Sequence, residues 1–326
     1  MRKVFLVSFD RSSDRTIDHL IPLLSGSPYQ IFYRTTEMDG YSMVGPERPA
    51  GMEEDLDMEG LIGEDRAIYS TLSGVSGTSN KFASPLLLKP EEADLIYEME
   101  ENVERGDLVL SLLDIGSKDV FIPASHFSSR VIAREAFSLC LISSRNRFKD
   151  FKQLEVLNRE FLDLSMGFHG IVGISPRVTR IGNYIDIAHM IRHLSEMTFR
   201  SGVINLDQAD LLSTSKGGSI LVMTWGAARP GGNPAATSTK DALLNPLCDI
   251  DLSTVRKALV NVLGSNELTL EDSLVASEVL RKRIRINARI IWGVNIIQDH
   301  GEDMEVFLIL ATNPMELLTH WYSKQT

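Results

Sequence analysis

Asn205, Asp207 and Asp210 have the residue types and spacing that could support chemistry in this 326-residue chain. Carboxylates so close together can position a water molecule or help to hold a cation. The same residue types also cap local backbone groups in a turn that ends a helix. From the residues alone, this stretch is either a reactive acidic loop or a local cap.

His189 and His193 form a second group, because a spacing of four places two rings on one face of a helix, where they can hold a metal. Asp186 and Glu196 lie nearby. No third ligand motif accompanies the pair, so we expect no metal site. Together with Arg192, these residues instead predict a polar stripe that faces solvent or a neighbouring subunit.

Four basic residues, Arg281, Lys282, Arg283 and Arg285, form a third group. Cations are favoured at the C-terminus of a helix, so a solvated helix end is the plainer interpretation. Contact with an anionic membrane or an acidic partner is the alternative.

The composition excludes several classes of protein. Hydrophobic residues make up 43% and charged residues 24%, which is typical of a folded chain and not of a disordered or fibrous one. The net charge of −11 disfavours nucleic acid as a partner. Cys140 and Cys248 stand in apolar stretches, which predicts buried thiols and neither a disulfide framework nor a cysteine-based zinc site.

No stretch of the sequence has the roughly 18 to 20 apolar residues that a membrane span needs. The apolar run at 4–7 is also too short for a signal peptide core. We therefore expect a cytoplasmic protein that does not insert directly into a membrane.

Apolar runs alternate with helical patterns, which predicts an α/β fold. The expected strands are 3–8, 30–33, 107–113, 139–143, 170–175, 218–224, 257–263, 288–297 and 304–311. The expected helices are 90–104, 128–137, 151–164, 184–199, 238–245 and 270–283, the last with Thr269 and Asp272 as a capping box. An acidic loop is expected at 38–65 and a flexible connection at 225–233.

The helix expected at 184–199 is apolar over most of its circumference, as a buried helix between two domains would be. We therefore divide the chain into 1–183, a central helix at 184–200, and a second α/β unit at 201–326.

The segment 202–210 resembles the loop that follows the central helix of FtsZ, the prokaryotic relative of tubulin, with Gln208 where that family has phenylalanine. The resemblance extends in order and spacing over about 120 residues. Its further matches are 216–218, 241–247, 258–264, 291–293 and 311–312.

This resemblance implies a tubulin/FtsZ-like fold: a Rossmann-type N-terminal domain, a central spine helix and a smaller α/β C-terminal domain. It also implies that Asn205, Asp207 and Asp210 promote GTP hydrolysis on a neighbouring subunit. In FtsZ a long linker and an adaptor-binding peptide follow this region, and we expect neither here.

The family's phosphate-binding features are weakened in the first half. The segment 8–13 lacks the glycines that let backbone amides approach a phosphate, and it adds Asp10. The family's glycine-rich signature maps onto 114–121, where only Gly116 remains beside Asp114 and Asp119. A unit charge about 4 Å from a phosphate is worth roughly 4 kcal/mol at an effective dielectric constant of about 20. These loops should repel GTP.

Four residues are the candidates for any remaining nucleotide contact. Tyr184 can still stack on a base, whereas Ala188 cannot bond the edge of the base. Gly74 and Gly77, within 72–80, retain something of a phosphate loop, although a plain turn is the simpler interpretation. Gly116 completes the set.

The leading functional hypothesis is an FtsZ-like cytoskeletal or cell-division protein with a degenerate GTP site. It would assemble longitudinally with itself or with a nucleotide-competent FtsZ-family protein, without a cofactor and without autonomous GTPase activity. The alternative is a divergent polymerising GTPase that binds GTP with magnesium through non-standard loops. A small-molecule binding protein is a third class, and it would leave the aspartate loop without a role.

Overall fold

The computed structural model describes residues 2–25, 27–35, 42–44, 99–115, 120–143, 151–175, 184–229, 231–297 and 304–324. The acidic segment 38–65 lies almost wholly outside these residues, and the segment 72–80 lies outside them entirely. So does most of the helix expected at 90–104.

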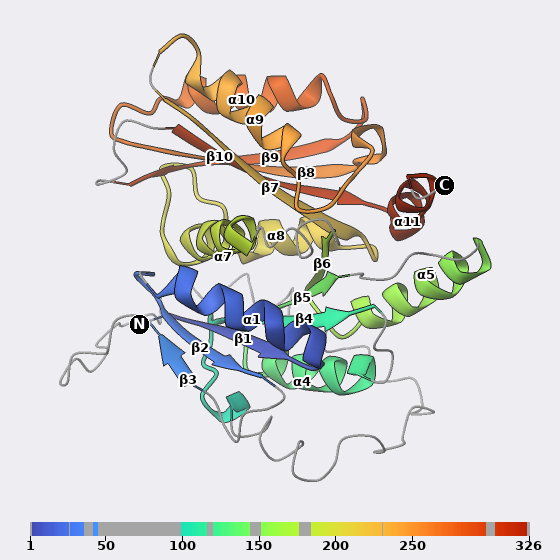
Figure 1. Cartoon of the computed structure of the whole chain (residues 1–326). Helices are drawn as coiled ribbons and strands as arrows, with labels where there is room; N and C mark the ends of the chain where they lie inside the picture. The colour runs from blue at the N-terminus through green and yellow to red at the C-terminus, as the bar shows by residue number, and fades with distance from the viewer. Residues whose placement is uncertain are drawn as a thin grey trace, which may run out of the picture.

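The first half of the chain forms a parallel sheet, as its unbroken apolar runs predict. Its strands are β1 (Lys3–Ser8), β2 (Gln30–Arg34), β4 (Leu108–Asp114), β5 (Phe137–Ser143) and β6 (Gly170–Ile174). A short antiparallel strand, β3 (Ser42–Val44), extends this sheet beside β2. The helices α1 (Arg11–Leu24), α4 (Phe121–Ala133) and α5 (Phe151–Ser165) accompany these strands (Figure 1).

The second half has its own strands, β7 (Ile220–Ala228), β8 (Lys257–Gly264), β9 (Arg289–Ile296) and β10 (Met304–Thr312). They lie in the order β7-β10-β8-β9. The helices α9 (Pro234–Leu244) and α10 (Leu270–Arg281) cover the outer face, the 3-10 turn η2 (Leu252–Thr254) precedes β8, and α11 (Pro314–Ser323) ends the described chain. The helices α7 (Tyr184–Phe199) and α8 (Gln208–Ser215) lie between the two halves (Figure 1).

A narrow junction joins the two sets of strands. β6 and β7 are parallel neighbours through only two residue pairs, Ile171 with Ile220 and Val172 with Leu221. The ten strands of the described part of the chain therefore form one continuous sheet. Strand directions differ between the two halves of the sheet, because in the second half β10 runs antiparallel to both of its neighbours, β7 and β8.

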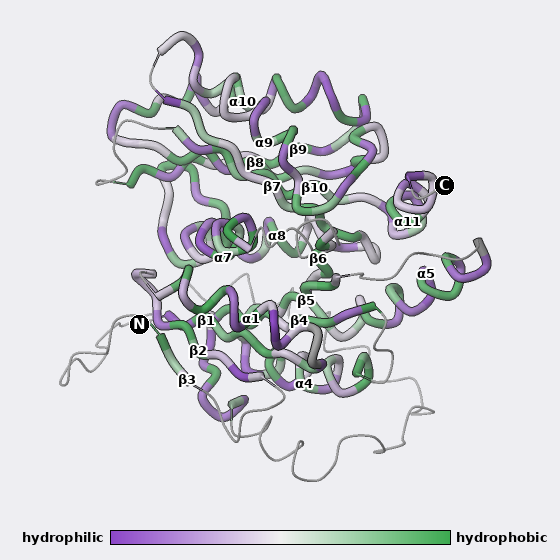
Figure 2. The backbone as a smooth tube through the Cα atoms, in the orientation of Figure 1, coloured by the Kyte–Doolittle hydropathy of each residue, from purple (hydrophilic) through white to green (hydrophobic). Residues whose placement is uncertain are grey.

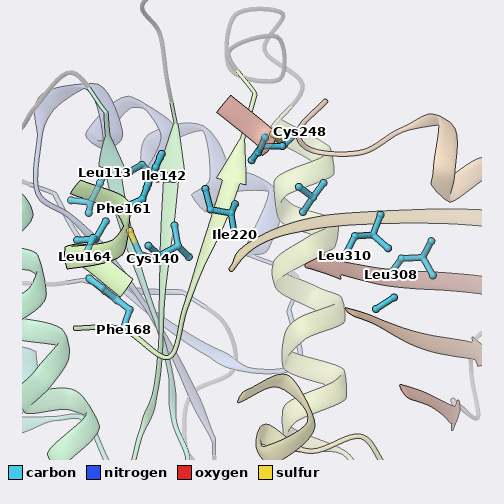
Figure 3. Packing of buried hydrophobic residues seen from close by; sticks show 14 of the residues in the cluster. Leu113, Cys140, Ile142, Phe161, Leu164, Phe168, Ile220, Cys248, Leu308 and Leu310 are labelled. Carbon is cyan, nitrogen blue, oxygen red and sulfur yellow. The ribbon is translucent and has the colours of Figure 1, made fainter. Parts of the chain in front are cut away.

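The core lies in two layers, one on each face of the sheet, and each layer runs through both halves. Figure 3 shows one layer passing from Leu113, Ile142 and Phe161 to Leu308 and Leu310. Cys140 and Cys248 both lie in this layer as buried free thiols, which confirms the prediction from their apolar neighbours. In Figure 2, polar and apolar residues alternate along α5 and α10, as expected of helices with one face on the core.

Most predicted strands and the central helix are confirmed to within a few residues, and α7 has the predicted bounds. The helix expected at 128–137 is wrong in position. It begins at Phe121, because Pro123 is tolerated in a first turn, and it ends before Glu135, whose φ of 60° stops the helix. The flexible connection expected at 225–233 is also wrong in its first part, since β7 continues through Ala228.

Candidate functional site

The acidic loop after α7 is held against the edge strand β9. The backbone N–H of Val203 donates to the carbonyl of Val294 at 2.8 Å, and the N–H of Val294 donates to the carbonyl of Ile204 at 3.0 Å. These two bonds form an antiparallel bridge between the loop and the strand. The loop is therefore part of the C-terminal half of the sheet.

Two glycines allow this close approach. A Cβ on Gly293 would lie 2.5 Å from Cγ of Leu206, and a Cβ on Gly202 would lie 2.5 Å from the carbonyl oxygen of Val294. Both distances are too short for any side chain. Because Leu206 is buried in the space that Gly293 leaves, the residues on either side of it have fixed positions.

Asp207 and Asp210 cap the N-terminus of α8 reciprocally. Oδ1 of Asp207 accepts from the N–H of Asp210 at 3.0 Å, and Oδ2 of Asp210 accepts from the N–H of Asp207 at 3.2 Å. Asn205 accepts from the N–H of Gly202 through Oδ1 at 3.3 Å. The cap predicted from these residues is present, but it begins a helix and does not end one.

The three site residues are nevertheless accessible. Asn205 and Asp207 are exposed, and Asp210 is partly buried. The capping box uses one oxygen of each carboxyl group, so capping and contact with another molecule are compatible. The loop can present two carboxyl groups and an amide at fixed positions.

Basic residues surround this loop. Burial raises the pKa of Asp210 above its usual value, and the charge of Arg289, at the start of β9, acts in the opposite direction. Burial also lowers the pKa of Lys257, helped by the charges of Arg289 and Lys216. The Lys257 ammonium donates to the carbonyls of Ser213 and Lys216, at the end of α8. Arg289 therefore acts on Asp210 at one end of α8 and Lys257 binds the other end, which the sequence analysis did not predict.

Asp10 lies in a second site, between the end of β1 and the start of α1. It is the N-cap of α1, and its carboxyl group accepts from the N–H of Ser13 at 2.8 Å and from the Ser13 hydroxyl at 3.0 Å. A third bond comes from the N–H of Asp114, at the end of β4, at 2.9 Å. The side chain thus joins a helix N-terminus to the adjacent parallel strand.

The carboxyl end of a parallel sheet, facing the N-terminus of a helix, is where α/β folds commonly bind anions. Asp10 lies at such an end of the sheet and is only 8% exposed. Burial raises its pKa above the usual value, partly offset by the bonds from Asp114 and Ser13. The sequence analysis identified Asp10 as an added acid but not as the group that fills this site.

The other candidates for nucleotide contact are less informative. Tyr184 is almost buried, and its ring stacks on His19 at a centroid distance of 4.4 Å. One face of the ring is therefore covered. Gly74, Gly77, Gly116 and Asp119 lie outside the described residues.

The prediction of a solvent-facing polar stripe on α7 is wrong for His193 and Glu196, which are 1% and 3% exposed. The His193 ring stacks on Phe307 of β10 at 5.0 Å, and its Nε2 lies 3.4 Å from the carboxylate of Glu305. His189 stacks on Trp225 of β7 at 4.0 Å.

The two imidazoles therefore pack α7 onto the C-terminal sheet. No group of three potential ligands is arranged for a metal ion among the residues that the structure describes. No helix in the described ranges is long and apolar enough to cross a membrane.

Comparison with known proteins finds a family similarity in the C-terminal half. The FtsZ family C-terminal domain matches residues 219–313. The cell division protein FtsZ of Methanothermobacter thermautotrophicus is 34% identical over 125 residues, which are 38% of this chain and 32% of that protein. The chain thus spans about a third of the length of this curated relative in the sequence match.

Solved structures extend the likeness to the whole chain. An FtsZ dimer from Methanocaldococcus jannaschii, solved empty, has a TM-score of 0.56 at 16% identity, covering 95% of this chain and 88% of that one. CetZ2 from Haloferax volcanii, solved as a GTPγS-bound protofilament, has a TM-score of 0.61 at 10% identity, covering 100% and 99%.

The chain has the FtsZ/tubulin fold, and its residues 219–313 are similar to the FtsZ family C-terminal domain. The resemblance seen in the sequence, over about 120 residues of the second half, is confirmed. The FtsZ-type acidic loop at 202–210 lies just before the matched domain. The Asp10 site lies in the half where structure alone shows the likeness.

Proposed function

We propose that this chain is an FtsZ-like cytoskeletal or cell-division protein that assembles longitudinally with itself or with a nucleotide-competent FtsZ-family protein. The dimer and the protofilament among its structural neighbours support assembly as the general mode of action. In this proposal the chain does not bind GTP productively itself. It supplies Asn205, Asp207 and Asp210 to the nucleotide of the next subunit.

The observation that carries the proposal is the contrast between the two aspartate sites. The Asp10 carboxyl group accepts from one N–H of the first turn of α1 and from the N–H at the end of β4, where we infer that a phosphate would otherwise bind. A bound phosphate would have to displace a side chain that accepts three hydrogen bonds. The Asp207 loop, by contrast, keeps its acids at the surface.

Such a subunit could join only one end of a conventional filament. Its acidic loop would face a nucleotide on the partner, whereas its own nucleotide-type face would offer no phosphate to the next subunit. The chain would then either cap that end or accelerate hydrolysis at the terminal site. Assembly of this chain should also be indifferent to added nucleotide, because a switch based on the γ-phosphate would have nothing to sense.

The first experiment measures the melting temperature with and without GTP and magnesium. A ligand at 100 times its dissociation constant stabilises a protein by about 2.7 kcal/mol, which would raise the melting temperature by a few degrees. We expect no shift at micromolar GTP. A clear shift, or assembly that requires GTP in light scattering, would favour a divergent GTPase.

The second experiment mixes this chain with a nucleotide-competent FtsZ from the same cell and follows phosphate release and filament length. Asp207→Ala and Asp210→Ala should abolish any acceleration of hydrolysis, since loss of a positioning acid typically costs about 100-fold in rate. Asp163→Ala, an exposed acid on α5, is the matched control. If the wild type changes neither turnover nor filament length, the acidic loop is only a helix cap.

A further inference from the structure

The segment 281–289 is the most strongly basic surface segment of the described C-terminal half. It contains five basic residues and no acid, in a chain whose net charge is −11. Arg281, Lys282, Arg283 and Arg285 are all exposed. Within the described part of the chain their side chains form no ion pair, so their charges are not neutralised locally.

The backbone of this segment is firmly held. The N–H of Ile284 donates to the carbonyl of Leu280 at 3.2 Å, and the N–H of Ala288 donates to the carbonyl of Arg285 at 2.9 Å. Ile284 and Ala288 are buried in the core at 7% and 6% exposure. The turn between them therefore has a fixed shape.

Ile286 projects from the tip of this turn. It is 86% exposed, the largest exposure of any large hydrophobic residue in the described chain. With Ile284 and Ala288 anchored on either side, the isoleucine cannot fold back onto the core. The result is one apolar side chain standing out beside four free cations.

The position of this turn leaves it accessible to a large flat partner. It follows α10, which packs on the outer face of the C-terminal sheet, away from α7 and the N-terminal half (Figure 1). Two further apolar residues of α10, Leu270 and Leu274, are about half exposed on the same helix.

The chemistry of the turn favours a lipid surface over a protein. Aromatic residues are enriched at the cores of protein interfaces, and the turn contains none, whereas its three arginines suit a protein or a lipid partner. A cluster of four Lys and Arg side chains attracts anionic headgroups, and an exposed aliphatic side chain beside it adds apolar contact with the interface. Because surface charges more than about 8 Å apart are screened at physiological salt, the local cluster can act despite the net charge of −11.

We propose that the turn 281–286 is a peripheral binding site for anionic lipid headgroups, with Ile286 entering the interfacial region of the bilayer. The contact is on the membrane surface and involves no spanning segment. It does not depend on the assembly proposed above. A single turn binds weakly, and a row of assembled subunits would multiply its affinity.

The test is sedimentation of the full chain with vesicles of phosphatidylcholine containing 30% phosphatidylglycerol, compared with pure phosphatidylcholine. We expect binding only to the anionic vesicles, decreasing from 50 to 300 mM salt. Each basic residue near an anionic surface contributes about fivefold to the partition coefficient. Arg283→Gln with Arg285→Gln should therefore weaken binding about 25-fold, and Ile286→Ala should weaken it without changing the salt dependence.

The matched control is Lys152→Gln with Arg159→Gln, which removes the same charge from the exposed face of α5. It should bind like the wild type. Equal binding to both kinds of vesicle, no binding to either, or an equal loss in the control would overturn the proposal. If the Arg283/Arg285 variant instead changes only self-association in ultracentrifugation, the turn contacts an acidic protein surface and the lipid assignment fails.

Discussion

Asp10 and Asp207 have the same local role, as helix N-caps, but one is buried and the other is exposed. Asp10 begins α1 and Asp207 begins α8, and each accepts a hydrogen bond from the N–H three residues later. Asp10 is 8% exposed and also binds a second element, β4, whereas Asp207 is exposed and is bonded within its own loop. The first carboxyl group is therefore enclosed by protein, and the second faces the surface.

This difference shows that two aspartates with the same capping role can differ in exposure, depending on what else the carboxyl group touches. Asp10 joins a helix to a strand more than 100 residues away in sequence, so its carboxyl group cannot move away without loss of a tertiary contact. The Asp207–Asp210 box needs nothing beyond its own turn. Its position therefore does not depend on a contact with the first half of the chain.

The largest expected effect comes from removing each cap in turn. Asp10→Ala removes the side-chain N-cap of α1 and leaves the buried N–H of Asp114 without this acceptor, while the N–H of Ser13 keeps its bond to the Asp10 carbonyl. Together the two losses should cost about 3 kcal/mol of unfolding free energy. Asp207→Ala removes an exposed N-cap and should cost about 1 kcal/mol. Urea unfolding of the two variants measures both. Equal losses would remove the distinction between the two sites.

Gly293→Ala should disrupt the contact that holds the acidic loop against β9. The new Cβ would lie 2.5 Å from Leu206 and 2.8 Å from the carbonyl of Ile204, so the loop must leave β9. We expect the unfolding free energy to fall by about 2 kcal/mol, as is typical of overpacking. The variant should also accelerate a partner's GTP hydrolysis less than the wild type does. Gly264→Ala is the control, since its Cβ would meet Leu268 at an ordinary 3.5 Å. A fully active Gly293→Ala variant would show that the position of the loop is unimportant.

Acid should weaken the contact between β5 and the turn that precedes β6. His169 precedes β6 and accepts the hydroxyl of Ser215 with its carbonyl, while its ring accepts from the N–H of Ser138. Burial lowers the pKa of His169 to about 4. A lowered histidine pKa stabilises the fold above pH 6.5, and this stability is lost as the pH falls towards 4.

His169→Asn keeps an acceptor for Ser138 but does not titrate. The wild type should lose about 2 kcal/mol relative to this variant between pH 7 and pH 5. Asp107, whose pKa burial raises to about 6, has the opposite trend, but it is common to both proteins and cancels in the difference. A constant difference across this range would contradict the assignment to His169.

The variant with the smallest expected change in stability separates the charge of Asp207 from its role as a helix cap. Asparagine caps helices as well as aspartate does, so Asp207→Asn should alter the unfolding free energy by less than about 0.5 kcal/mol. It removes the charge that the proposed action in trans needs. Hydrolysis by a mixed partner should therefore fall to the level seen with Asp207→Ala. An Asp207→Asn variant that still accelerates hydrolysis would leave the residue with a structural role alone.

Much of the fold could be predicted because its elements have strong local signals. The apolar runs at β1, β4 and β5, and α7 with apolar residues over most of its circumference, need no partner to be recognised. The capping box of α10 was likewise predicted from Thr269 and Asp272 and is confirmed. α1 has weaker signals, since it contains Pro22 and many polar residues, and the sequence analysis did not predict it.

The details of the sites depended on long-range contacts. The acidic loop was identified from its residues, but its attachment to β9 depends on Gly293, almost 90 residues further along the chain. The polar side chain of His193 predicts exposure. It is buried because its ring stacks on Phe307 and lies beside the carboxylate of Glu305. Asp10 looked like a repulsive charge because its donor on Asp114 comes from another strand.

The narrow junction between β6 and β7 has a consequence for how the chain is made. β6 ends at Ile174, and β7 begins only at Ile220. At about 5 to 20 residues per second, a ribosome needs a few seconds to deliver β7. Throughout that interval the parallel sheet of the first half presents β6, an apolar strand, as a bare edge. The nascent chain is therefore most prone to aggregation, and most dependent on chaperones, just before its FtsZ-type domain emerges.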